Sequence, residues 1–206
     1  MIAVDDIATG LAQRNVQLTD PGPDGGHAAV AVILHEPTPG DVRLLIIERA
    51  RHPGDPWSGD LAFPGGRVDP DDSDERAAAQ RETMEEVGLD LSTARLLGRL
   101  DDLSARVLPL SVSAFVYSLD SATDLTPSDE VFAAFWVPVA HIVDEKRHCH
   151  HLRQDGDNPG RYPAIDLFGP GKPLLWGVTY HFVYAMLREA GHELPTAIAS
   201  SGGTSP

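Results

Sequence analysis

The order of strand and helix signals along the chain predicts an α/β or α+β fold built on a mixed β-sheet. Short apolar runs bounded by turn residues, such as residues 28–34, are typical of buried strands. Longer segments rich in helix formers, residues 72–88 and 174–190, are separated by several such runs. Because strands and helices interleave, a sheet with helices packed against it accounts for the pattern.

The strand signals begin with a predicted hairpin. Residues 28–34 (AAVAVIL) and 42–47 (VRLLII) flank a turn at 37–40 that contains Pro and Gly. Further extended segments are predicted at residues 61–63, 94–100, 108–117 and 135–139. Polar or Gly- and Pro-rich composition predicts loops at residues 20–26, 50–60 and 144–163.

Helix signals occur in three places. Residues 1–17 can form a short amphipathic helix. In the central segment, Asp72 with Glu75 three residues later resembles a capping box, and Gly88 is a natural helix stop. The third predicted helix covers residues 174–190.

The chain is long enough for one domain with a full-sized core and additional terminal segments. We divide it into an N-terminal helix and loop (1–26), a main domain (27–194) and a tail (195–206). The tail, PTAIASSGGTSP, is expected to be disordered.

Composition narrows the functional classes. A formal net charge of −15 repels polyanions and disfavours nucleic-acid binding. A phosphate-bearing substrate then needs a local cation, and a bound divalent metal is the obvious source. There is no membrane-length apolar run and no secretory signal pattern, and Cys149 alone cannot form an internal disulfide. We therefore expect a cytoplasmic protein without membrane or nucleic-acid partners.

Three carboxylates cluster on the predicted central helix. Glu82, Glu85 and Glu86 stand at i, i+3 and i+4, so they share one face of the helix. One interpretation is a solvated acidic face; the other is a site for hard divalent cations, which take oxygen ligands. The preceding Gly65 and Gly66 favour the second, because glycine lets backbone carbonyls approach a metal or phosphate closely.

The segment from Gly66 to Leu89 resembles the Nudix box, G-x5-E-x7-R-E-U-x-E-E-x-G-U, in which U is bulky and aliphatic. Its second half, RETMEEVGL from Arg81, matches closely, with Thr83 at a position that is usually aliphatic. In the first half, Gly66 lies one residue too far from Arg81, and Ser73 stands where a glutamate is usual.

The resemblance covers about residues 27–190 and includes AFPGG at 62–66 and WVP at 136–138. It implies a Nudix-type α/β/α sandwich around a mixed β-sheet. It also implies hydrolysis of a diphosphate linkage in a small nucleotide-derived molecule, with Mg²⁺ or Mn²⁺ as cofactor.

The resemblance assigns roles to the residues of the box. Glu85 and Glu86 correspond to the main metal ligands, and Glu82 to a ligand or to a group that orients the attacking water. The carbonyl of the neighbouring Gly65 or Gly66 is a further expected ligand.

Arg81 is expected to fix the glutamates through charge-assisted hydrogen bonds.

Residues outside the helix complete the predicted site. The general base is a box glutamate or Glu130, which can equally be a solvated loop acid. Arg49 can contact a phosphate or pair with Glu48 or a loop acid, and Trp57 can stack on a base or anchor its loop. Gly65-Gly66 is expected to lie against the substrate.

Within the family, the sequence is most similar to the coenzyme A pyrophosphatase branch. It shares the Gly66-to-Arg81 spacing, the G-x-x-A-F-P-G-G pattern at 59–66 and the Trp-Gly-x-Thr pattern at 176–179. It departs from the branch's R-S-x-x-L-R-x-H-x-G-Q pattern at 49–60, where Asp60 replaces Gln and the segment is one residue longer. ADP-ribose, a dinucleotide and a nucleoside triphosphate are the alternative substrates.

Two alternatives belong to other functional classes: a nucleotide-sensing module that has lost catalysis, and a purely structural acidic helix. The intact Arg-Glu-x-x-Glu-Glu set favours catalysis. His148-Cys149-His150-His151 contains zinc-ligand residue types, but adjacent strand residues point to opposite faces. A polar insertion near the substrate mouth is the favoured interpretation. Because Nudix domains often dimerise, a homodimer is a further expectation.

Overall fold

The computed structural model describes residues 2–23, 25–55, 57–105, 109–122, 124–154 and 159–194. The tail predicted to be disordered, residues 195–206, lies outside these ranges.

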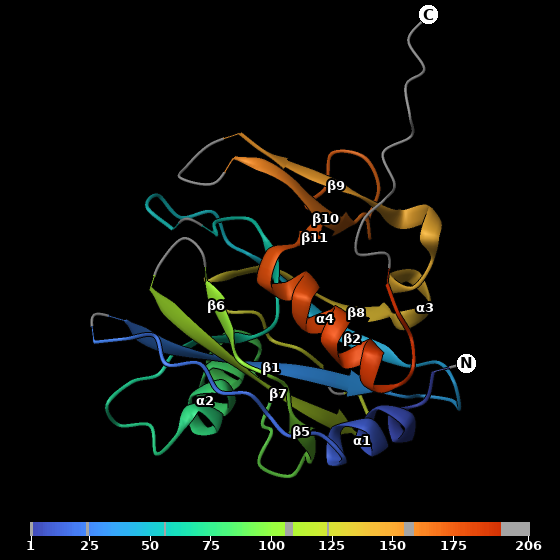
Figure 1. Ribbon diagram of the computed structural model, residues 1–206, viewed down its shortest axis with the longest axis horizontal. Coiled ribbons are helices and arrows are strands. Elements are labelled where there is room, and N and C mark those ends of the chain that lie inside the picture. Colours follow the sequence, from blue (N-terminus) through green and yellow to red (C-terminus); the bar gives the residue numbers. More distant parts are fainter. Residues whose placement is uncertain are drawn as a thin grey trace, which may run out of the picture.

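Most of the described strands join one mixed sheet, which forms the middle layer (Figure 1). Its main path runs in the spatial order β3 (Leu61–Ala62), β2 (Arg43–Arg49), β1 (Gly26–His35), β7 (Leu110–Leu119) and β5 (Arg95–Arg99). Three further strands, β4 (Gly65–Arg67), β6 (Leu103–Ala105) and β8 (Val131–Pro138), pair with β1, β7 and β2. Because β1 is parallel to β7 but antiparallel to β2, the sheet is mixed, as predicted.

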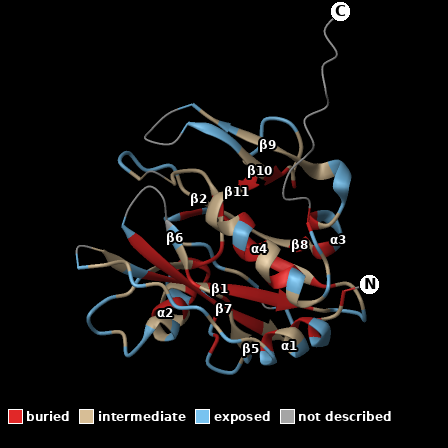
Figure 2. Ribbon diagram, in the orientation of Figure 1, coloured by how far each residue is buried: buried red, intermediate tan, exposed pale blue. Residues whose placement is uncertain are grey.

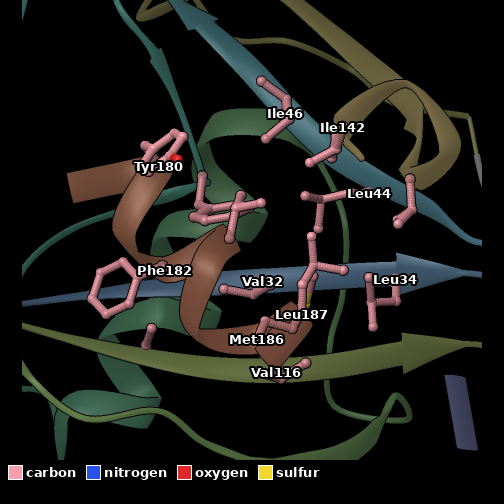
Figure 3. Packing of buried hydrophobic residues seen from close by; sticks show 14 of the residues in the cluster. Val32, Leu34, Leu44, Ile46, Val116, Ile142, Tyr180, Phe182, Met186 and Leu187 are labelled. Carbon is pink, nitrogen blue, oxygen red and sulfur yellow. The ribbon is translucent and has the colours of Figure 1, made fainter. Parts of the chain in front are cut away.

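Helices cover both faces of this sheet, which confirms the α/β/α sandwich (Figure 1). On one face lie α1 (Val4–Ala12) and α4 (Gly177–Glu189), and on the other lies α2 (Glu75–Val87). The short α3 (Val139–Ile142) directly follows β8. Figure 3 shows side chains of the α4 face, where Phe182, Met186 and Leu187 pack near Val32 and Leu34 of β1.

Burial on both faces explains the composition of β1. Val32 and Leu34 belong to the apolar cluster under α4, whereas Ala31 and Ile33 belong to the cluster under α2. A strand covered on both sides has no solvent-facing side, so its sequence is a continuous apolar run and does not alternate between apolar and polar residues. Figure 2 shows the resulting burial along β1 and the neighbouring β7.

A second, three-stranded antiparallel sheet corrects the predicted loop at 144–163. It contains β9 (His148–Arg153), β10 (Gly160–Ile165) and β11 (Leu175–Trp176), and a 3₁₀ turn at Glu145–Arg147 precedes it. Most of the β9 and β10 side chains stay exposed or half-buried (Figure 2). Their backbone pairing therefore occurs without the alternating apolar pattern by which strands are recognised in a sequence.

The predicted bounds of all three helices need correction. The third, predicted at 174–190, begins at Gly177, because Leu175 and Trp176 pair with β10 as β11. The first helix ends at Ala12 and not at residue 17, because Gln17 takes part in hydrogen bonds with Asp101 and Asp102 of a distant loop. The central helix is capped by Asp74, whose Oδ1 accepts from the Ala77 N–H at 2.7 Å, and not by Asp72. The predicted stop at Gly88 is confirmed, since it adopts the left-handed conformation with φ of 69°.

Candidate active site

The glycine loop before α2 is held against the central strand of the sheet. Gly65 pairs with Val30 and Gly66 pairs with Ala29 in the β4–β1 ladder. Gly65 has φ of 152°, and a Cβ on it would lie 2.6 Å from the Val30 Cα, so this approach requires glycine. The sheet therefore fixes the position of the loop that faces the acidic helix.

Glu86 is the buried member of the acidic cluster. It is 3% exposed, and its Oε2 accepts a hydrogen bond from the Gly65 N–H at 2.9 Å. Loss of solvation raises the pKa of Glu86 to about 7, although the Gly65 N–H and the positive charge of Arg49 oppose this shift. A buried carboxylate with a raised pKa is stabilised by any additional cation that binds beside it.

Glu82 lies between the helix and the glycine loop. Burial is the main cause that raises its pKa, and the contact with Arg81 opposes this effect. A Cβ on Gly66 would collide with the Glu82 carboxylate, so the missing side chain leaves room for that group. This close approach places the Glu82 carboxylate against the backbone of Gly66.

Arg81 connects two of the three glutamates. Its Nη1 donates to Glu82 Oε1 at 2.9 Å and to Glu85 Oε2 at 3.0 Å. The Glu85 side chain is 57% exposed, so this member of the cluster faces solvent. The pairing of Arg81 with Glu85 across one helical turn is the one expected from their spacing.

Asp72 is a site residue that the sequence analysis missed. Its carboxylate receives two hydrogen bonds from Arg81, and Arg81 is the main cause that lowers the pKa of Asp72. Counting six residues forward from Gly66 reaches Asp72, whereas counting eight back from Arg81 reaches Ser73. The extra residue of this box therefore lies between Asp72 and Arg81, and the forward count would have identified the acid.

The loop before β8 places Glu130 near the acidic helix. The Ser128 N–H donates to the Glu86 carbonyl at 2.9 Å, and the Ala50 N–H donates to the Glu130 carbonyl at 2.8 Å. The side chain of Glu130 is exposed, and its negative charge contributes to the raised pKa of Glu82 and of Glu86. The fold thus brings together Glu130 and the box glutamates, which are distant in sequence.

The predicted substrate residues of the 49–60 segment have neighbours within the protein. Arg49 forms an ion pair with the loop acid Asp55 at 2.9 Å and lies 4.0 Å from Glu86. Trp57 is half-buried and packs against the apolar core, consistent with a loop anchor. Asp60 accepts a hydrogen bond from the Trp176 indole at 3.2 Å, and burial raises its pKa to about 6.

The residues fit a divalent cation by their chemistry. Three carboxylates and the Gly66 carbonyl supply oxygen donors, which Mg²⁺ and Mn²⁺ prefer. In the described parts of the chain, no three His, Cys, Asp or Glu side chains already surround a common point as metal ligands. Arg81 occupies one oxygen each of Glu82 and Glu85, so these carboxylates would have to reorient to hold a cation.

The histidine segment forms β9, with successive side chains on alternating faces. His148 Nε2 lies 2.8 Å from the Ile142 carbonyl, and His150 Nδ1 lies 3.2 Å from Arg161. His151 stacks on Trp176 with ring centroids 4.1 Å apart. Trp176 therefore links His151 to Asp60, because its indole donates to the Asp60 carboxylate.

Comparison with known proteins agrees with this arrangement. The NUDIX domain family matches residues 25–155, more than half of the chain. The chain is 30% identical over 210 residues to the uncharacterized Nudix hydrolase NudL of Escherichia coli SMS-3-5, covering 96% of this chain and 95% of that protein.

It is also 36% identical over 126 residues to the human mitochondrial coenzyme A diphosphatase NUDT8, covering 59% of this chain. This chain spans only about half (51%) of the human protein's length.

A solved structure supports the fold over most of the chain. A MutT/nudix family protein from Enterococcus faecalis aligns with a TM-score of 0.55 and 17% identity, covering 93% of this chain and 72% of that one. None of the helices in the described ranges has the length and apolar character needed to cross a membrane. The family match and the near full-length similarity to NudL establish that the chain belongs to the Nudix hydrolase family.

Proposed function

We propose that this chain hydrolyses a diphosphate linkage in a nucleoside diphosphate derivative, using Mg²⁺ or Mn²⁺ bound within the domain of residues 27–194. The observation that carries the proposal is the approach of Glu82 and Glu86 to the Gly65-Gly66 loop, with Glu85 linked to Glu82 through Arg81. Glu86 is buried there against a backbone N–H, whereas a purely solvated acidic face would leave it in water. The burial favours a metal site over a structural acidic helix.

Each residue of the site has a proposed role. Glu85 and Glu86 are the main metal ligands, with Glu82 and the Gly66 carbonyl completing the oxygen donors. Bound Mg²⁺ or Mn²⁺ neutralises phosphate charge and lowers the pKa of a coordinated water. Arg81 holds Glu82 and Glu85 in place until the cation binds.

Two groups are proposed to act on the substrate and the attacking water. Glu130 is exposed and close to the box glutamates, so it can accept a proton from water on the open side of the site. Glu82 is the alternative base. Arg49 is already paired with Asp55, so its contribution to phosphate binding is a fixed positive charge beside Glu86.

Coenzyme A or one of its derivatives is the proposed substrate. The name of the human relative, a coenzyme A diphosphatase, supports it, as does the shared Gly66-to-Arg81 spacing. Asp60 in place of the usual Gln leaves ADP-ribose, a dinucleotide or a nucleoside triphosphate as the second choice. Homodimerisation and a cytoplasmic location stay predictions from the sequence.

A substrate panel with product identification tests the proposal. With Mg²⁺ or Mn²⁺, coenzyme A should yield adenosine 3′,5′-bisphosphate and phosphopantetheine. Glu86→Gln should lower turnover by orders of magnitude, while Glu75→Gln, on the same helix but outside the cluster, should retain it. Turnover of ADP-ribose alone would reject coenzyme A, and nucleotide binding without hydrolysis of any panel member would indicate a sensing module.

A further inference from the structure

Three aromatic rings form a row on one face of the second sheet. His151, Tyr162 and Trp176 come from β9, β10 and β11. His151 and Tyr162 are direct partners across the β9–β10 ladder, and Trp176 pairs with Ala164, two residues beyond Tyr162. The Trp176 ring centroid lies 4.1 Å from that of His151 and 5.8 Å from that of Tyr162. We call these three residues the aromatic row.

The row is not part of the buried core. All three residues are half-buried, and they belong to neither apolar cluster. The core-facing positions of the same strands are different residues, Ile165 and Leu175, which are fully buried under α4. The three side chains are therefore partly accessible to solvent and lie outside the two apolar clusters of the core.

A continuous series of contacts joins the row to the acidic cluster. The Trp176 indole donates to Asp60 Oδ1 at 3.2 Å, and the Asp60 carbonyl accepts from the Arg49 N–H at 3.0 Å. Arg49 in turn lies 4.0 Å from Glu86. Two residues, Asp60 and Arg49, thus connect the aromatic row to the buried carboxylate of the proposed metal site.

Polar groups border the row in a way that suits a nucleoside. Asp60 presents a carboxylate, and the positive charge of Arg153, on the same strand as His151, acts on both of these side chains. Burial is the main cause that lowers the pKa of His151, which favours the uncharged ring as a stacking surface. A purine base stacks on such faces, and the exocyclic amino group of adenine can donate a hydrogen bond to a carboxylate.

We propose that the aromatic row, bordered by Asp60, is the subsite that holds the purine base of the substrate. The proposal rests on the proposed function, because it places the base of a nucleotide-derived substrate beside the diphosphate-cleaving glutamates. It assigns base stacking to His151, Tyr162 and Trp176, and leaves Trp57 as the anchor of its loop.

Binding of adenosine 5′-monophosphate without added metal tests the subsite separately from catalysis. Calorimetry should show that the wild-type chain binds this probe more tightly than ribose 5-phosphate, which lacks the base. His151→Ala should weaken binding of the base-bearing probe by about 10-fold, the order expected for one lost stacking contact. His151→Phe should retain the preference, and so should Leu152→Ala, since Leu152 is 60% exposed and adjacent to His151 on β9.

Tyr162→Leu provides a second variant in case His151→Ala fails to fold, which a thermal melt would reveal. Equal affinity of the wild-type chain for the two probes, or an unchanged preference in folded His151→Ala and Tyr162→Leu, would overturn the subsite. A selective subsite in a chain that hydrolyses no diphosphate would uphold this inference and reject the proposed function. Hydrolysis of a diphosphate substrate by a chain that shows no base selectivity would uphold the proposed function and reject this inference.

Discussion

Arg81 donates to the two carboxylate oxygens of Asp72, from Nε at 3.1 Å and from Nη2 at 2.9 Å. The Asp72 side chain is 6% exposed and also accepts from the Asp69 N–H at 2.8 Å. This two-point contact orients the guanidinium, so that its remaining nitrogen faces Glu82 and Glu85. Asp72 therefore acts on the acidic cluster through Arg81.

Asp72→Asn is expected to loosen the acidic cluster without unfolding the protein. The neutral amide keeps one hydrogen bond to Arg81 but cannot form the paired, charge-assisted contact. Residues that support metal ligands in this way typically contribute about 10- to 100-fold in metal affinity or activity. A Mn²⁺ titration followed by electron paramagnetic resonance should show this loss, while Asp69→Asn, at an acid 63% exposed and 3.7 Å from Arg81, should bind Mn²⁺ normally.

Gly65→Ala and Gly66→Ala are expected to fail in different ways. Alanine at position 65 meets both an unfavourable φ and the Val30 backbone, so it should lower the free energy of unfolding by about 1–3 kcal/mol or more. Alanine at position 66 meets only the flexible Glu82 carboxylate, so it should leave the melting temperature nearly unchanged but weaken Mn²⁺ binding. Equal effects of both variants on stability would contradict this assignment.

Asp60→Asn is expected to stabilise the protein above pH 6. The folded-state pKa of Asp60 is about 6, above the ordinary value of 3.8. The stability that the protonated Asp60 carboxyl contributes is therefore fully present below pH 3.8 and is lost as the pH rises through 6. At pH 7 the free energy of unfolding of the variant should exceed that of the wild type by about 1–3 kcal/mol, and the difference should shrink toward pH 4.

Denaturant titrations across this pH range provide the measurement for Asp60. Asp90→Asn is a control of opposite sign, because hydrogen bonds from Ser92 hold the pKa of Asp90 below its usual range. Its destabilisation should be present at neutral pH and disappear as the pH falls through the folded-state pKa. A pH-independent difference for Asp60→Asn would show that this carboxyl titrates normally in the folded protein.

Thr83→Val is expected to leave activity unchanged and to maintain or raise stability. Thr83 is fully buried, and its hydroxyl donates only to the Ala79 carbonyl of its own helix, at 2.7 Å. Valine keeps the shape and removes a buried polar group whose partner retains a helical hydrogen bond. Thr83→Ser should instead lower the melting temperature, because it removes a fully buried methyl group at a cost of about 1 kcal/mol.

Local regularities account for what could be predicted without the structure. The spacing of Arg81, Glu82, Glu85 and Glu86 depends only on helical geometry, which places i, i+3 and i+4 on one face. The runs at 28–34 and 42–47 were interpretable as a hairpin because both are almost wholly apolar and a turn sequence separates them. Both features arise from residues that are close together in the chain.

Contacts between distant residues account for what could not be predicted. The 144–163 segment forms β9 and part of its partner β10 through backbone pairing, which leaves no apolar pattern in the sequence. The approach of Trp176 to Asp60 joins residues 116 positions apart, and no local spacing encodes it. The sequence by itself determined the sheet with its helices and the acidic helix, because short-range periodicity specifies them. It also indicated the family, through the resemblance of residues 66–89 to the Nudix box. Tertiary packing alone decided which glutamate is buried, which acid orients Arg81 and which aromatic rings lie beside the site.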